Sequence, residues 1–206
     1  MSYSYIKRSV EELEQIAAIV LSRYAKRCSG CFVDIEAIAE DCGLTILPRQ
    51  GGLRNYVEGY VATNPHYIVV PDQLTSYAGR YRPVIAEELC HAILEYDFLS
   101  QGDTLPCDAQ PHALTKQQHL DIETDARYLS LAILLPREKF SSRFNACFQF
   151  NPSDGAANKD KLLRHCADQL EHDFHVWSLS IAYRARDLRL ITVDECRRNF
   201  SNRIPM

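Results

Sequence analysis

The 206-residue sequence has no apolar run that approaches the roughly 18–20 residues needed to span a bilayer. Its first residues, Met1 to Arg8, lack the apolar core of a secretory signal peptide. Basic residues are not in excess either, because 23 lysines and arginines stand against 27 acidic residues and give a net charge of −4. These absences argue against a membrane-spanning helix, export and a protein-wide field that attracts nucleic acid. They predict a cytoplasmic protein with no membrane partner.

The cysteines lack the pattern of a zinc or redox site. The chain has eight, and Cys28-Ser-Gly-Cys31 is the only close pair. No second pair follows at the spacing that a structural zinc site requires. Because the chain has an ordinary size and no export signal, we expect reduced thiols, many of them buried, and no disulfide framework.

The hydrophobic share of 46% allows a sizeable core, and the chain has no internal repeat. Apolar spacing and turn residues predict an α+β fold with helices packed around a small sheet. A loop is expected over 100–115 and a linker over 151–159, and Pro83 is placed in the first turn of its helix. The helices are predicted at 10–27, 33–42, 82–98, 117–135, 161–174 and 177–190, and the strands at 44–47, 56–63 and 67–70.

The segment Ile85-Ala-Glu-Glu-Leu-Cys-His91 lies inside one predicted helix. Glu87 and His91 are one turn apart and share a helix face, and Glu88 is rotated from them by about 100°. Zinc peptidases use this geometry: two side chains one turn apart bind the metal, and the glutamate after the first ligand acts as general base. The first ligand there is histidine, and a Glu–His pair at this spacing is also common on solvated helix faces.

A second amphipathic helix supplies Glu123, and a catalytic zinc often takes its third protein ligand from a neighbouring helix. With Ala86, Ala126 and Leu134-Leu-Pro136, these segments resemble the ImmA/IrrE family of metallopeptidases. That family has an alanine before its HExxH helix, a glutamate followed three residues later by alanine, and a leucine-rich stretch that ends in proline. The resemblance extends over about 11–190.

The resemblance implies a zincin-like metallopeptidase domain at 1–150 and a helical, helix-turn-helix-like subdomain at 160–206. It also implies that His91 and Glu123 bind a divalent metal and that Glu88 is the general base. The expected reaction is hydrolysis of a peptide bond in a DNA-binding repressor by metal-activated water.

Glu87 departs from the family's pattern. A ligand set of Glu87, His91 and Glu123 sets two negative charges against a divalent cation, which makes bound water less acidic than in an active zinc site. Oxygen ligands also shift the preference from zinc towards manganese or iron. Three outcomes stay open: an active peptidase, a slow one, or a metal-free relative that serves as a protein-binding or sensing module.

The closing segment 170–188 has the residue pattern of a helix-turn-helix. It indicates a third class of function, that of a DNA-binding regulator. Arg184, Arg186 and Arg189 could meet phosphates there. Acidic residues in and beside the segment dilute the positive field, and its turn lacks glycine. Packing of these helices on the rest of the chain is therefore favoured over direct DNA binding.

Other residues near the motif carry less weight. His119 lies one turn before Glu123 and could share the metal face or face solvent. Cys90 points away from the proposed ligands and is expected in the core. Tyr96 and Tyr128 could stabilise an oxyanion, but packing is the usual role of tyrosine on such a helix. Surface positions are expected for His165, His172 and His175.

Overall fold

The computed structural model describes residues 5–50, 59–63, 66–99, 115–151 and 155–200. Helices predominate in this part of the chain, and the strands are short. The helices are α1 (Val10–Arg23), the 3₁₀ turn η1 (Ala25–Arg27), α2 (Ile35–Asp41), α3 (Asp72–Thr75), α4 (Ala78–Leu99), α5 (Lys116–Leu134), α6 (Arg137–Cys147), α7 (Ala156–Phe174), α8 (Ser178–Asp187) and α9 (Val193–Phe200). The strands are β1 (Cys28–Ser29), β2 (Phe32–Val33), β3 (Thr45–Arg49), β4 (Tyr60–Thr63) and β5 (His66–Pro71).

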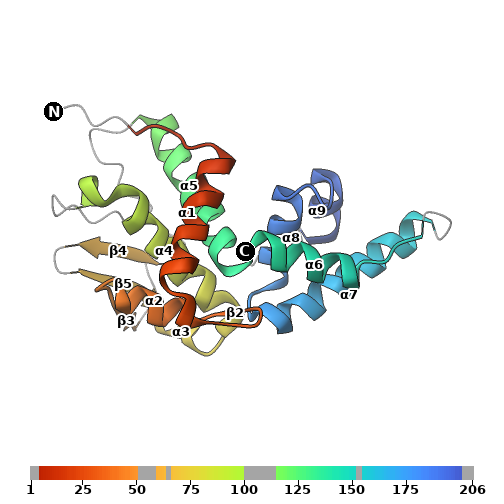
Figure 1. Ribbon diagram of the computed structural model, residues 1–206, viewed down its shortest axis with the longest axis horizontal. Coiled ribbons are helices and arrows are strands. Elements are labelled where there is room, and N and C mark those ends of the chain that lie inside the picture. Colours follow the sequence, from red (N-terminus) through yellow and green to blue (C-terminus); the bar gives the residue numbers. More distant parts are fainter. Residues whose placement is uncertain (1–4, 51–58, 64–65, 100–114, 152–154, 201–206) are drawn as a thin grey trace.

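The small sheet lies on one side of the molecule and helices α6 to α9 lie on the other, with α1 and α5 between them (Figure 1). The sheet has the order β3-β5-β4, in which β5 pairs in parallel with β3 and antiparallel with β4. Buried residues of β5, such as Ile68 and Val70, join the core together with residues of α4 and α5. The predicted α+β fold class is confirmed.

Local sequence signals explain the first two helices. Ser9 caps α1, since its side chain accepts a hydrogen bond from the Glu12 amide and the Glu12 carboxylate accepts one from the Ser9 amide. Asp34 caps α2 by accepting from the Ala37 amide. After α2, Gly43 has a φ of 82°, the left-handed conformation expected at the end of this helix. Both predicted helices are confirmed, although α1 ends earlier and continues as η1.

The predicted position of Pro83 is wrong. α4 begins at Ala78, so Pro83 lies inside the helix and leaves the carbonyl of Gly79 without its usual donor. The amide of Trp177, just before α8, donates to that carbonyl at 2.8 Å. A residue from a distant part of the chain therefore donates the hydrogen bond that proline cannot donate to Gly79. The helix can for this reason continue through Pro83.

The β1–β2 hairpin and the helices α3, α6 and α9 were missed in the sequence. The cysteine pair Cys28–Cys31 lies in a β1–β2 hairpin whose turn contains Gly30, with a φ of 58°. α6 directly follows Pro136, which was expected only to end α5. α9 begins with a capping box between Thr192 and Glu195, a signal that the sequence does carry. α7 begins within the predicted linker, and residues 152–154 of that linker lie outside the described residues, as do the turns at 51–52 and 64–65 and most of the loop at 100–115.

Two buried arginines connect distant elements. Arg82 on α4 donates to the carbonyls of Phe174, His175 and Val33, and its guanidinium lies over the ring of Phe32. Burial lowers the pKa of Arg82 to about 10. These bonds join α4 to the β1–β2 hairpin and to the turn between α7 and α8, which fixes the start of the helix that carries the motif.

Arg184 on α8 is fully buried. It donates to both carboxylate oxygens of Glu14 on α1, at 2.8 and 3.2 Å, and to the carbonyl of Leu135 at 3.0 Å. The expectation that Arg184 could meet phosphates is therefore wrong, because its guanidinium is engaged inside the protein. Most of α8 is buried as well, which agrees with packing of this helix on the rest of the chain. In the described part of the chain, no helix has the length and apolar character needed to cross a membrane.

Candidate metal centre

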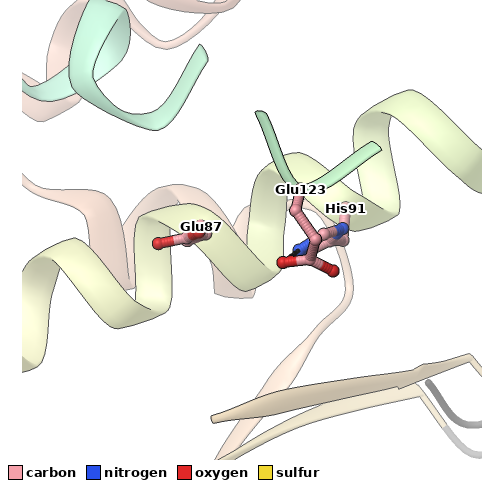
Figure 2. Close-up of side chains that lie close together, drawn as sticks. All are labelled: Glu87, His91 and Glu123. Atoms are coloured by element: carbon pink, nitrogen blue, oxygen red, sulfur yellow. Dashed lines mark ion pairs between the residues drawn. The ribbon is translucent and has the colours of Figure 1, made fainter. Parts of the chain in front are cut away.

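Two packed helices bring the proposed ligands together. Glu87 and His91 project from α4 one turn apart, and Glu123 projects from α5 (Figure 2). Each offers one ligand atom, and these atoms all lie within 4.8 Å of one another. Among the described residues, this is the one group of at least three histidine, cysteine or acidic side chains with such a geometry.

His91 and Glu123 form a contact between the two helices of the cluster. The Nε2 atom of His91 lies 3.7 Å from Oε2 of Glu123, and the two side chains are 7% and 30% exposed. Burial alone raises the pKa of Glu123. The nearby imidazole of His91 outweighs burial, aided by the charges of His119 and Arg127, and the pKa lies below its ordinary value. Glu123 is therefore held as a carboxylate, the form that binds a metal.

Glu88 lies beside the cluster but in a different environment. Only 5% of the residue is exposed, and its carboxyl group accepts a hydrogen bond from the backbone amide of Val61 on β4. Burial raises the pKa of Glu88 to about 8, with further upward contributions from Glu87 and Glu123 and an opposing one from His91. Two adjacent glutamates on one helix thus differ in burial and in what they contact.

Gly59, immediately before β4, makes this arrangement sterically feasible. A Cβ atom at this position would lie 2.7 Å from Cγ1 of Val84 and 3.2 Å from Oε1 of Glu88. A side chain there would collide with α4, so the backbone of β4 can approach Glu88 only with glycine at 59. Neither Gly59 nor Val61 was identified in the sequence, because neither belongs to a motif and their contact with α4 is long-range.

The donor set fits a divalent cation. Two carboxylates and one imidazole are ligands used by zinc, manganese and iron, and the three side chains are half-buried or buried. In a tetrahedral site with bonds of about 2.1 Å, ligand atoms lie about 3.4 Å apart. The cluster would therefore contract by no more than about 1.4 Å on binding, within the range of side-chain rotation.

The other cysteine, tyrosine and histidine residues considered in the sequence lie mostly in the core or at the surface, as expected. Cys90 is fully buried in the core, as expected, and Tyr128 donates to Glu14 rather than facing the cluster. His119 is not part of the group of ligand atoms, although its charge acts on Glu123. The side chain of Tyr96 lies outside the described residues. The three C-terminal histidines, His165, His172 and His175, are exposed, as expected.

Comparison with known proteins shows a likeness at the level of structure. No protein-family model and no curated protein matches the chain. Among solved structures, a Mycobacterium tuberculosis transcriptional regulator matches with a TM-score of 0.56 and 18% sequence identity over 85% of this chain. The match covers 46% of the regulator, so the chain spans about half of that protein's length. At this identity, the likeness shows a shared fold.

Proposed function

We propose that this chain is a metal-binding regulatory module in which Glu87, His91 and Glu123 hold a divalent cation. The observation that carries the proposal is the convergence of three ligand atoms from two helices within 4.8 Å. The likeness to a transcriptional regulator, of which this chain spans about half, supports a regulatory setting. In this proposal the module acts in the cytoplasm and binds a protein partner, such as a DNA-binding repressor.

The ligand set supports a sensing or binding role. Two carboxylates neutralise the charge of a divalent cation, so the cation withdraws less electron density from a bound water or carbonyl than it would with neutral ligands. The proposed ions are zinc, manganese and iron, with the last two favoured by the oxygen donors. Under this proposal, residues 1–150 form the metal-binding unit, and residues 160–206 form a helical unit attached to it.

Metal binding is tested on protein stripped of metal and titrated calorimetrically with Zn²⁺, Mn²⁺ and, without oxygen, Fe²⁺. We expect one equivalent to bind, and His91→Ala to weaken binding by about 100-fold or more because it removes a direct ligand. The matched control is His119→Ala, a histidine near the cluster but outside it, which should change affinity by less than about threefold. If the two variants bind the metal with equal affinity, the proposed site is ruled out.

A second candidate is hydrolysis of a peptide bond in a repressor, as the resemblance to the ImmA/IrrE family implies. The position of Glu88 favours it, since a buried carboxyl group lies next to the cluster and is held by the Val61 amide. A bound divalent cation would polarise a carbonyl and acidify water. In its ionised form, Glu88 would take the proton from that water at a carboxylate oxygen and pass it to the leaving amine.

Two substitutions separate the candidates. Glu88→Gln should leave metal affinity within about threefold and lower cleavage of the partner by at least about 100-fold. Glu87→His creates the family's usual ligand pair, so it should raise zinc affinity and the cleavage rate. If metal binds but neither the native chain nor Glu87→His cleaves a co-expressed repressor, the hydrolase candidate fails and the binding module stands.

A further inference from the structure

The helices α8 and α9 line an open pocket that is separate from the metal-binding residues. Its volume is about 240 Å³. This is about eight times the roughly 30 Å³ that one water molecule occupies in the liquid. Its apolar wall includes Leu179, Cys196 and Phe200, which are 9%, 4% and 1% exposed. None of the residues that line it belongs to the proposed metal cluster. A small apolar body therefore fits the interior of this pocket.

Two arginines bring positive charge to the pocket, and the charge of one of them, Arg186, is partly offset by an ion pair with Asp187. Arg186 from α8 and Arg197 from α9 both line it, and none of its lining residues is acidic. Arg186 is held in place by an ion pair with Asp187, whose Oδ1 accepts from Nε at 2.9 Å and from Nη2 at 2.6 Å, and its guanidinium carbon lies 5.0 Å from the centroid of the Tyr183 ring. It is therefore a preorganised donor beside an aromatic ring.

Arg197 differs from its neighbour on α9. Arg198 forms an ion pair with Asp160, at 2.9 Å, whereas Arg197 is exposed and makes no hydrogen bond or ion pair within the described residues. A guanidinium that lines an apolar pocket and makes no hydrogen bond within the described residues favours a bound anion, because it forms charge-assisted hydrogen bonds with a carboxylate.

We propose that this pocket binds a small organic carboxylate that has an aromatic or branched apolar body. The apolar body lies against Leu179 and Phe200, and the carboxylate meets Arg186 and Arg197. The volume limits the ligand to about a dozen non-hydrogen atoms, and it is smaller than the roughly 300–1,000 Å³ that is usual for ligand pockets. The inference goes beyond the metal site and does not depend on it.

The probes are benzoate and its neutral isostere benzamide, added to the full chain and followed by saturation-transfer NMR and calorimetry. Benzoate should bind at least about tenfold more tightly than benzamide, because only benzoate has a charge for the arginines. Arg197→Ala and Arg186→Ala should each weaken benzoate at least about fivefold and leave benzamide unchanged. Val193→Phe, at a position that lines the pocket and is 55% exposed, should weaken both probes by filling the space.

Arg189→Ala is the matched control, because Arg189 is an exposed arginine next to α8 that does not line the pocket. It should change benzoate affinity by less than about twofold, since a general field is screened by salt. The proposal is overturned if Arg189→Ala acts as strongly as Arg197→Ala, or if benzoate and benzamide bind equally. It is also overturned if inorganic phosphate displaces benzoate with the same affinity, or if benzoate, phenylacetate and 3-methylbutanoate all fail to bind at about 10 mM.

Discussion

At the scale of single residues, the identical neighbours Glu87 and Glu88 take different positions because a helix rotates by about 100° per residue. Glu87 faces the same side of α4 as His91 and contributes to the cluster of ligand atoms. Glu88 turns towards β4, where it is buried against Val61 and Gly59. Such a division between a carboxyl group in a ligand cluster and a buried one beside it is the pattern from which acid–base sites are built.

Gly59→Ala should destabilise the protein by about 1–3 kcal/mol, because the added Cβ overlaps Val84 and presses on Glu88. The measurement is the free energy of unfolding in urea. Gly79→Ala is the control, since its Cβ would lie 3.4 Å from the nearest atom, an ordinary contact, and alanine favours a helix. A Gly59→Ala protein as stable as the Gly79→Ala protein would contradict the close approach of β4 to α4.

At the scale of elements, α4 depends on a partner from the other end of the sequence. Its interior proline cannot donate a hydrogen bond to the carbonyl of Gly79, and the amide of Trp177 donates one instead. Arg82, the residue before Pro83, donates hydrogen bonds to the carbonyls of Phe174 and His175, which lie at the same α7–α8 turn as Trp177. The helix that carries Glu87, Glu88 and His91 is therefore anchored by the α7–α8 turn.

Pro83→Ala should change the free energy of unfolding by less than about 1 kcal/mol, whereas removing a proline from the interior of an isolated helix gains about 3 kcal/mol. The reason is that the carbonyl of Gly79 already accepts a hydrogen bond from Trp177. Urea unfolding of the two proteins provides the measurement. A gain near the full 3 kcal/mol would show that the bond from Trp177 does not offset the proline.

The contact between Glu14 on α1 and Arg184 on α8 should make the stability of the protein depend on pH. Burial raises the pKa of Glu14, but bonds from Arg184, Tyr128 and Arg137 outweigh it and lower the pKa below 4.5. Because the pKa of the folded state is the lower one, the ionised group stabilises the fold above pH 4.5, and this contribution is lost as the pH falls through the lowered value.

Unfolding of Glu14→Gln and of the native chain should therefore be compared at pH 6 and at about pH 3. We expect the native chain to lose its advantage over Glu14→Gln at the lower pH. Glu11→Gln, at an exposed position on the same helix, serves as the control for a general loss of negative charge. An advantage of the native chain that is the same at both pH values would contradict the role of the Glu14 carboxylate.

At the scale of the whole molecule, buried contacts cross between the predicted regions 1–150 and 160–206. Arg82 and Arg184 each bond across this division, and Phe140 packs against Phe174 with 5.8 Å between ring centroids. Because buried ionic and aromatic contacts are lost together, we expect the two regions to unfold in one cooperative transition.

The single tryptophan makes this measurable. Trp177 lies in the C-terminal region, so its fluorescence reports that region, whereas far-ultraviolet circular dichroism reports all helices. The two transitions in urea should coincide in midpoint and in slope. A fluorescence transition at lower urea than the dichroism transition would show that the C-terminal helices unfold on their own.

Short-range patterns account for much of what could be predicted. The apolar spacing of α1 and α5, the start of a helix near Asp34 and the strand around Ile68 depend on neighbouring residues, and these predictions are confirmed. The error at Pro83 has a long-range cause, the amide of Trp177. The hairpin at Cys28–Cys31 was missed because its two strands have only two residues each, too few for a period to be read.

The sequence by itself determined which side chains could share a helix face, because the turn of a helix fixes that Glu87 and His91 lie together whatever surrounds them. The tertiary structure alone decided that Glu123 reaches them, since that depends on how α4 packs on α5. It also decided that β4 approaches Glu88 at Gly59 and that Arg184 is buried against Glu14. These are contacts between residues far apart in the chain, and their geometry is set by packing rather than by local order.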